Sequence, residues 1–124
     1  MRVVVADTTP LNYLILIGEI ALLPTLFDVV RIPETVRTEL RHPGAAARVR
    51  IWADHPPDWI EIHAEPALAT IDPMLSVLDD GEAQTIVLAG SLHADLILMD
   101  DRNGVAEYRD MIPKTNWGAR ETLR

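Results

Sequence analysis

Five acidic side chains are the residues of this chain whose type and position suit shared chemistry. They are Asp7, Glu39, Glu82, Asp100 and Asp101. Two carboxylates about 4 Å apart repel by roughly 4 kcal/mol at an effective dielectric near 20, so a cluster of them needs protonation or a bound cation. Oxygen ligands, in a chain without cysteine, select Mg²⁺ or Mn²⁺ over zinc. Such an ion can orient and deprotonate a water and stabilise in-line attack on a phosphodiester.

The elements that would position these acids are strands and helices in alternation along the chain. Apolar or alternating runs predict strands, and apolar residues spaced by about one turn predict helices. Strands are expected at 3–6, 29–32, 59–63 and 95–99, and helices at 11–17, 20–27, 33–40, 45–53 and 79–92. This alternation predicts an α/β fold, with a mostly parallel sheet and helices on both of its faces.

The predicted strands place the acids at one edge of the sheet. Asp7 ends the first strand, and Asp100 with Asp101 ends the fourth. Side chains at the carboxyl ends of parallel strands converge on one edge. Glu39 lies on the helix after the second strand and Glu82 in the first turn of the helix before the fourth, so each could point to that edge.

Each acid also has a simpler interpretation. Asp7 before Thr-Thr-Pro could cap a helix, and Glu82 with Asp79 forms a capping-box-like pattern. Glu39 could be an exposed helical acid, and Asp101 begins an ordinary turn sequence. These interpretations do not explain why all the acids fall at one edge.

Composition narrows the class of protein. The 124 residues carry a net charge of −8 and are 48% hydrophobic, which predicts one domain over 1–124 with a sizeable core. The absence of cysteine excludes a disulfide scaffold and thiol catalysis, and it fits a reducing compartment. No stretch is apolar enough for a membrane span. We therefore expect a cytoplasmic protein that has no membrane partner.

Four arginines follow the second predicted strand closely. They are Arg37, Arg41, Arg48 and Arg50, here called the arginine strip. Arginine binds phosphate in a forked geometry, so the strip is a candidate contact for an RNA backbone. A solvated helical face is the alternative interpretation. Trp52 and Trp59 could stack bases, but packing in the core is the more common role of such residues.

Four segments together resemble the PIN-domain nucleases, in particular the VapC-like toxins of prokaryotic toxin–antitoxin systems. They are VVVADTTPLNYLILIGEIALLPTLF, VVRIPETVRTEL, LDDGEAQTIVLAG and ADLILMDDRNGVAE, and they span residues 3–107. The specificity lies in their order and spacing. The resemblance implies a three-layer α/β/α fold and Mg²⁺- or Mn²⁺-dependent cleavage of RNA. It further implies a cognate antitoxin that occupies the groove, and a homodimer.

The resemblance assigns roles residue by residue. The first-strand aspartate falls on Asp7, and its neighbouring hydroxyl on Thr8 or Thr9, which would orient that carboxylate or a phosphate oxygen. The glutamates of the V-x-x-E-L and G-E-A pieces fall on Glu39 and Glu82. Either Asp100 or Asp101 matches the late acid. From about residue 112 the chain departs from the family pattern, so an altered edge strand is expected there, near Ile112.

Two other functions compete with a nuclease. The first is a non-catalytic PIN-like module that binds RNA or protein and keeps the acids as helix caps. The second is a receiver-like domain with a phosphoacceptor aspartate, which would need paired acids after the first strand and a late lysine. Here the paired acids come late, and Lys114 is the only lysine.

Overall fold

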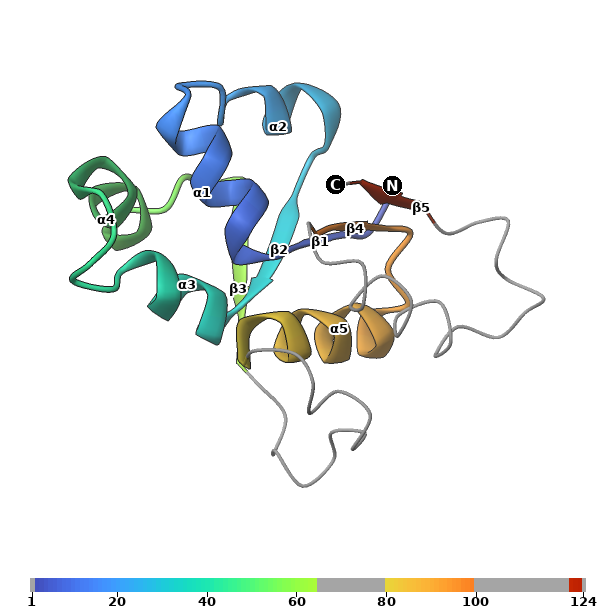
Figure 1. The fold of residues 1–124 in the computed structure, drawn as a ribbon. Helices are drawn as coiled ribbons and strands as arrows, with labels where there is room; N and C mark the ends of the chain where they lie inside the picture. The colour runs from blue at the N-terminus through green and yellow to red at the C-terminus, as the bar shows by residue number, and fades with distance from the viewer. Residues whose placement is uncertain (1, 65–79, 100–120, 124) are drawn as a thin grey trace.

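The computed structural model describes residues 2–64, 80–99 and 121–123. Within them the chain alternates between strands and helices, as Figure 1 shows. The elements are β1 (Val4–Ala6), α1 (Thr8–Leu16), α2 (Leu22–Leu26), β2 (Val30–Pro33), α3 (Glu34–Leu40), α4 (Ala47–Asp54), β3 (Ile60–His63), α5 (Asp80–Leu92), β4 (Leu96–Leu98) and β5 (Glu121–Leu123).

The strands form one sheet in the order β3-β2-β1-β4-β5. Every neighbouring pair is parallel, with Val5 beside Arg31 of β2 and Ala6 beside Leu98 of β4. Parallel neighbours need crossover connections. Helices α1 and α2 connect β1 to β2, and α3 and α4 connect β2 to β3. The expected parallel sheet is confirmed, and β1 lies at its centre with its carboxyl end next to that of β4.

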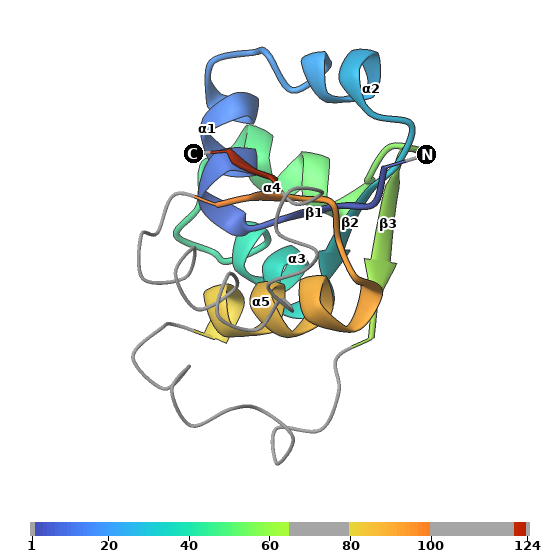
Figure 2. The same cartoon turned by 90° about the vertical axis from the view of Figure 1, so that its right-hand side faces the viewer.

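Helices cover both faces of the sheet, so the fold has three layers (Figures 1 and 2). Alternate residues of β1 show the division: Val4 and Ala6 pack in the core shared with α1 to α4, whereas Val5 packs in the core shared with α5. All three are fully buried. Burial of a valine-sized side chain contributes about 1.5–3 kcal/mol, so strand alternation fixes which helices lie on which face.

The ends of the elements differ from the predicted ends by a few residues. Helix α1 begins at Thr8 rather than at Leu11, because Asp7 accepts a hydrogen bond from the Thr8 N–H and so caps the helix earlier. None of the described helices is long and apolar enough to cross a membrane.

The C-terminus differs most from expectation. Residues 117–124 have little periodic pattern, yet Glu121–Leu123 forms β5 and pairs with β4. A strand of three residues is too short to show an alternating pattern, and its pairing depends on the backbone of its neighbour. The edge strand expected near Ile112 lies outside the described residues.

Candidate functional site at the carboxyl edge of the sheet

Asp7 lies at the centre of the carboxyl edge, directly after β1. Its residue is only 2% exposed. Its backbone N–H donates to the Leu98 carbonyl at 2.9 Å, which holds it beside the end of β4. Its Oδ1 accepts from the Thr8 N–H at 2.8 Å. Asp7 is therefore both the cap of α1 and a carboxylate at the predicted edge.

A second residue, Thr85, contacts Asp7 from α5, which covers the face of the sheet opposite to α1. Its hydroxyl lies 3.3 Å from Asp7 Oδ1 and 2.7 Å from the Gly81 carbonyl oxygen, and the residue is fully buried. No motif or charge in the sequence marks Thr85 as a site residue. The available signal was its place three residues after Glu82, nearly one helical turn along a helix with an apolar face.

Glu39 reaches the same edge from α3. The Thr8 hydroxyl donates to Glu39 Oε2 at 2.8 Å, so Thr8 contacts Asp7 through its backbone and Glu39 through its side chain. Thr9, the other predicted hydroxyl, is exposed. Two acids separated by 32 positions, Asp7 and Glu39, are thus linked through one threonine.

The start of α5 packs directly against Glu39. A Cβ atom added at Gly81 would lie 2.7 Å from Glu39 Oε2 and closer still to Oε1, distances that real Cβ atoms do not show. Glycine at 81 therefore allows the helix to approach the carboxylate. We call Asp7, Thr8, Glu39, Gly81 and Thr85 the acidic edge.

Of the three remaining predicted acids, the structure describes only Glu82. Glu82 follows Gly81 as the third residue of α5 and is half-buried. That is the glutamate position of a capping box, whose other residue, Asp79, lies outside the described residues. Asp100 and Asp101 follow Met99 and also lie outside them.

The described donors fit Mg²⁺ or Mn²⁺ in their chemistry, although they do not complete a site. Among the residues with described positions, no three His, Asp or Glu side chains form a group that could hold a metal ion. Asp7 and Glu39 offer carboxylate oxygens, and Mg²⁺ is commonly held by one or two carboxylates together with water and substrate phosphate. The acids that could add to this pair are Glu82, Asp100 and Asp101.

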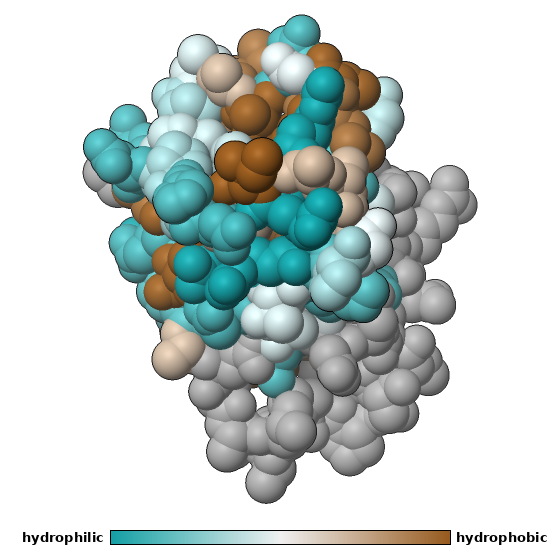
Figure 3. All heavy atoms as spheres, turned by 90° about the vertical axis from the view of Figure 1, so that its left-hand side faces the viewer, coloured by the Kyte–Doolittle hydropathy of each residue, from teal (hydrophilic) through white to brown (hydrophobic). Residues whose placement is uncertain are grey.

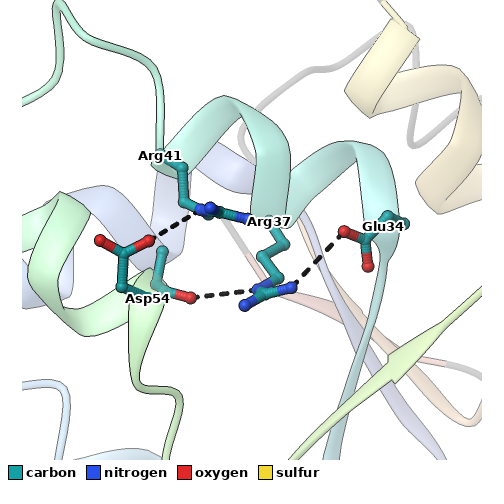
Figure 4. Close-up of polar contacts among 5 residues, drawn as sticks. Glu34, Arg37, Arg41 and Asp54 are labelled. Carbon is teal, nitrogen blue, oxygen red and sulfur yellow. Dashed lines mark hydrogen bonds and ion pairs between the residues drawn. The ribbon is translucent and has the colours of Figure 1, made fainter.

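Two residues of the arginine strip, Arg37 and Arg41, contact the end of α4 instead of the acidic edge. Arg37 Nε donates to the Ala53 carbonyl at 3.1 Å, and its Nη1 lies 3.7 Å from Glu34 Oε1 (Figure 4). Arg41 Nε lies 2.8 Å from Asp54 Oδ1 (Figure 4). These contacts tie α3 to the end of α4.

The other two arginines belong to α4. Arg48 Nη1 donates to the Leu16 carbonyl at 3.1 Å, at the end of α1 where backbone acceptors lack helical partners. Arg50 Nε is buried and, within the described part of the chain, has no hydrogen-bond partner. Trp52 and Trp59 pack together, with ring centroids 6.2 Å apart, against the core beneath α1 to α4.

Apolar side chains are also exposed on this side of the molecule. Figure 3 shows brown atoms gathered in the upper part of the face and strongly hydrophilic atoms across its middle. Among the residues that the structure describes, the exposed large apolar side chains are Tyr13, Leu16, Ile17, Leu22, Leu26 and Ile51. They come from α1, α2, α4 and the loop after α1.

Comparison with known proteins identifies the family. A family model, DUF3368, described as a PIN domain, matches residues 3–110. No curated protein and no solved structure matches the chain significantly. The family match covers all the predicted acids and supports a nuclease-type fold over a receiver-like one. The chain belongs to the DUF3368 family of PIN domains.

Proposed function

We propose that this protein is a metal-dependent endoribonuclease and the toxin of a toxin–antitoxin pair. The observation that carries the proposal is the meeting of Asp7 and Glu39 through Thr8, at the carboxyl edge of a parallel sheet in a PIN domain. Parallel α/β sheets place their ligand sites at this edge. The all-oxygen donor chemistry suits Mg²⁺ or Mn²⁺.

In this proposal each residue has a simple task. Asp7 and Glu39 supply carboxylate oxygens, with Glu82 and either Asp100 or Asp101 completing the set. The Thr8 N–H and hydroxyl hold the first two carboxylates in fixed orientation. A bound Mg²⁺ or Mn²⁺ would supply Lewis acidity toward water and the scissile phosphate. The chain's own contribution is to bring acids from separate elements together at one edge of the sheet.

The test is cleavage of a mixed RNA pool by the purified protein, with the cleavage ends mapped. Cleavage is expected with Mn²⁺ or Mg²⁺, and none with EDTA or in Asp7→Asn. Metal-dependent cleavage that survives in Asp7→Asn would indicate a contaminating nuclease or a different site, and no cleavage by the wild type would remove the enzymatic proposal.

The second candidate function is a non-catalytic PIN-like module that binds RNA or protein. Asp7 favours it to the extent that its carboxylate caps α1. Thermal unfolding separates the two functions. A metal at about 100 times its dissociation constant should stabilise the fold by roughly 2.7 kcal/mol. An unchanged melting temperature in millimolar Mn²⁺ would favour the binding module.

The toxin proposal includes two protein partners, a small antitoxin that would cover the acidic edge and a second copy of this chain. The exposed apolar side chains on α1, α2 and α4 are of the kind that protein partners cover. Sedimentation velocity of the purified chain tests the second copy: a concentration-independent monomer would contradict it. Loss of RNA cleavage when a purified candidate antitoxin is added tests the antitoxin.

A further inference from the structure

The Thr85 hydroxyl has two acceptors and one proton. Its oxygen lies 2.7 Å from the Gly81 carbonyl and 3.3 Å from Asp7 Oδ1. A carbonyl and an ionised carboxylate can only accept, so the hydroxyl donates to one of them or is shared between both. Thr85 is fully buried, and Asp7 nearly so, which makes each donor at this carboxylate count for more than it would in water.

The Gly81 carbonyl does not depend on this hydroxyl. Gly81 and Thr85 lie four residues apart within α5, and α-helical geometry pairs that carbonyl with the backbone N–H of residue 85. The Thr85 side chain is thus a second donor there. At Asp7 Oδ1, by contrast, the hydroxyl that Gly81 shares comes within 3.3 Å of an oxygen that already accepts from the Thr8 N–H, so donors from α1 and α5 approach the same oxygen.

We propose that Thr85 is a positioning residue, whose hydroxyl, together with the Thr8 N–H, fixes the Asp7 carboxylate for a divalent cation. This inference rests on the proposed function. Two donors on one oxygen restrict rotation of the carboxylate plane, so the geometry offered to the cation is set before it binds. Loss of such a supporting hydrogen bond typically costs 10- to 100-fold in metal affinity or activity.

The experiment compares Thr85→Val, which has the same shape without the hydroxyl, with Thr85→Ser, which keeps it. Mn²⁺ binding is measured by titration of the metal-free protein, with RNA cleavage measured separately. Thr85→Val is expected to bind Mn²⁺ about 10- to 100-fold more weakly and to lose cleavage in proportion. Thr85→Ser is expected to bind it within about threefold of the wild type.

Thr25→Val is the matched control. The Thr25 hydroxyl donates to the Leu22 carbonyl at 2.6 Å within α2, away from the acidic edge. The Thr25→Val variant should bind Mn²⁺ with the same affinity as the wild type. Urea unfolding in EDTA gives a further readout: a purely structural Thr85 would lose stability in Thr85→Val without a change in Mn²⁺ affinity. Should Thr85→Val fail to fold, Thr85→Ala against Thr85→Ser makes the same comparison.

Two results would overturn the inference while leaving the proposed function intact. One is unchanged Mn²⁺ affinity in Thr85→Val, and the other is an equal loss in Thr85→Ser. A wild-type protein that neither binds Mn²⁺ nor cleaves RNA would instead refute the proposed function itself. The two failures are therefore distinguishable.

Discussion

The acidic edge and the arginine strip are both clusters of charged residues, but their side chains have different partners. At the edge, neutral donors reach the acids: the Thr8 N–H and the Thr85 hydroxyl at Asp7, and the Thr8 hydroxyl at Glu39. Hydrogen bonds of this kind orient a carboxylate without cancelling its charge. In the strip, Arg41 faces an opposite charge, and Arg37 binds both an acid and a carbonyl.

The contrast shows that partners, rather than charge density, distinguish a candidate site from a structural joint. The acids of the edge come from separate elements and lie where the strands end. The contacts of Arg37 and Arg41 connect α3 to α4, and Arg48 connects α4 to α1. Variants on the two surfaces should therefore change different properties, activity at the edge and stability in the strip.

Asp7→Asn should have the largest effect. Asparagine caps helices as well as aspartate does and relieves repulsion among the acids, so the fold should be as stable or more so. RNA cleavage should fall to background, beyond the 10- to 100-fold typical of a merely supporting group. The cleavage rate measures the loss of activity, and urea unfolding measures the stability of the fold. Asp54→Asn, an acid of the strip side, is the control and should keep its cleavage; retained activity in Asp7→Asn would place the site elsewhere.

Gly81→Ala should come next, through displacement of Glu39. The added Cβ would overlap the Glu39 carboxylate, which sits at the end of a flexible side chain and can move away. The Thr8–Glu39 bond, about 0.5–1.5 kcal/mol, would be lost, but alanine is favoured in helices by up to about 1 kcal/mol. We expect cleavage to fall at least about tenfold, with stability changed by less than about 1 kcal/mol.

Gly44→Ala is the matched control for this variant. A Cβ at residue 44 would meet only the His42 side chain, at 3.1 Å. Its cleavage should equal that of the wild type. If Gly81→Ala cleaved RNA as fast as the wild type, the close packing of α5 on Glu39 would have no role in activity.

The sequence predicted the order of elements and the location of Asp7 and Glu39 because both follow from local patterns. The apolar run before Asp7 marks a buried strand, and the V-x-x-E-L pattern places Glu39 on the helix that follows the second strand. Gly81 and Thr85 were missed, since their roles depend on how closely α5 approaches other layers. The partners of the arginine strip were missed for the same reason: they depend on how α3 packs on α4.

Arg37→Ala should mainly affect stability. Loss of the donation from Nε to the Ala53 carbonyl is expected to cost about 1 kcal/mol of unfolding free energy, with cleavage unchanged. Arg37→Lys provides the discriminating variant, because lysine keeps the charge but lacks the guanidinium fork. It should lose as much stability as Arg37→Ala. If Arg37→Lys kept its RNA affinity while Arg37→Ala lost it, the charge at this position would serve RNA binding.

Arg41→Ala should have the smallest effect. Its ion pair with Asp54 is half-exposed on both sides, at 47% and 48% of the side chains. Exposed pairs contribute about 0.2–1 kcal/mol, and near 1 M salt the screening length falls to about 3 Å. The stability difference from the wild type should therefore be small in dilute buffer and vanish in high salt, as urea unfolding at both salt concentrations would show.

RNA titrations of the same variant decide whether the comparison holds. An arginine that contacts phosphate contributes roughly one unit to the slope of log affinity against log salt concentration. Arg41→Ala should leave that slope unchanged, because the Arg41 Nε is paired with the Asp54 carboxylate. A slope reduced by about one unit, with normal stability, would show that Asp54 yields Arg41 to RNA. The strip would then be an RNA-binding surface whose side chains exchange their internal partners for phosphate. The acidic edge and the strip would both serve RNA cleavage, the first in catalysis and the second in binding.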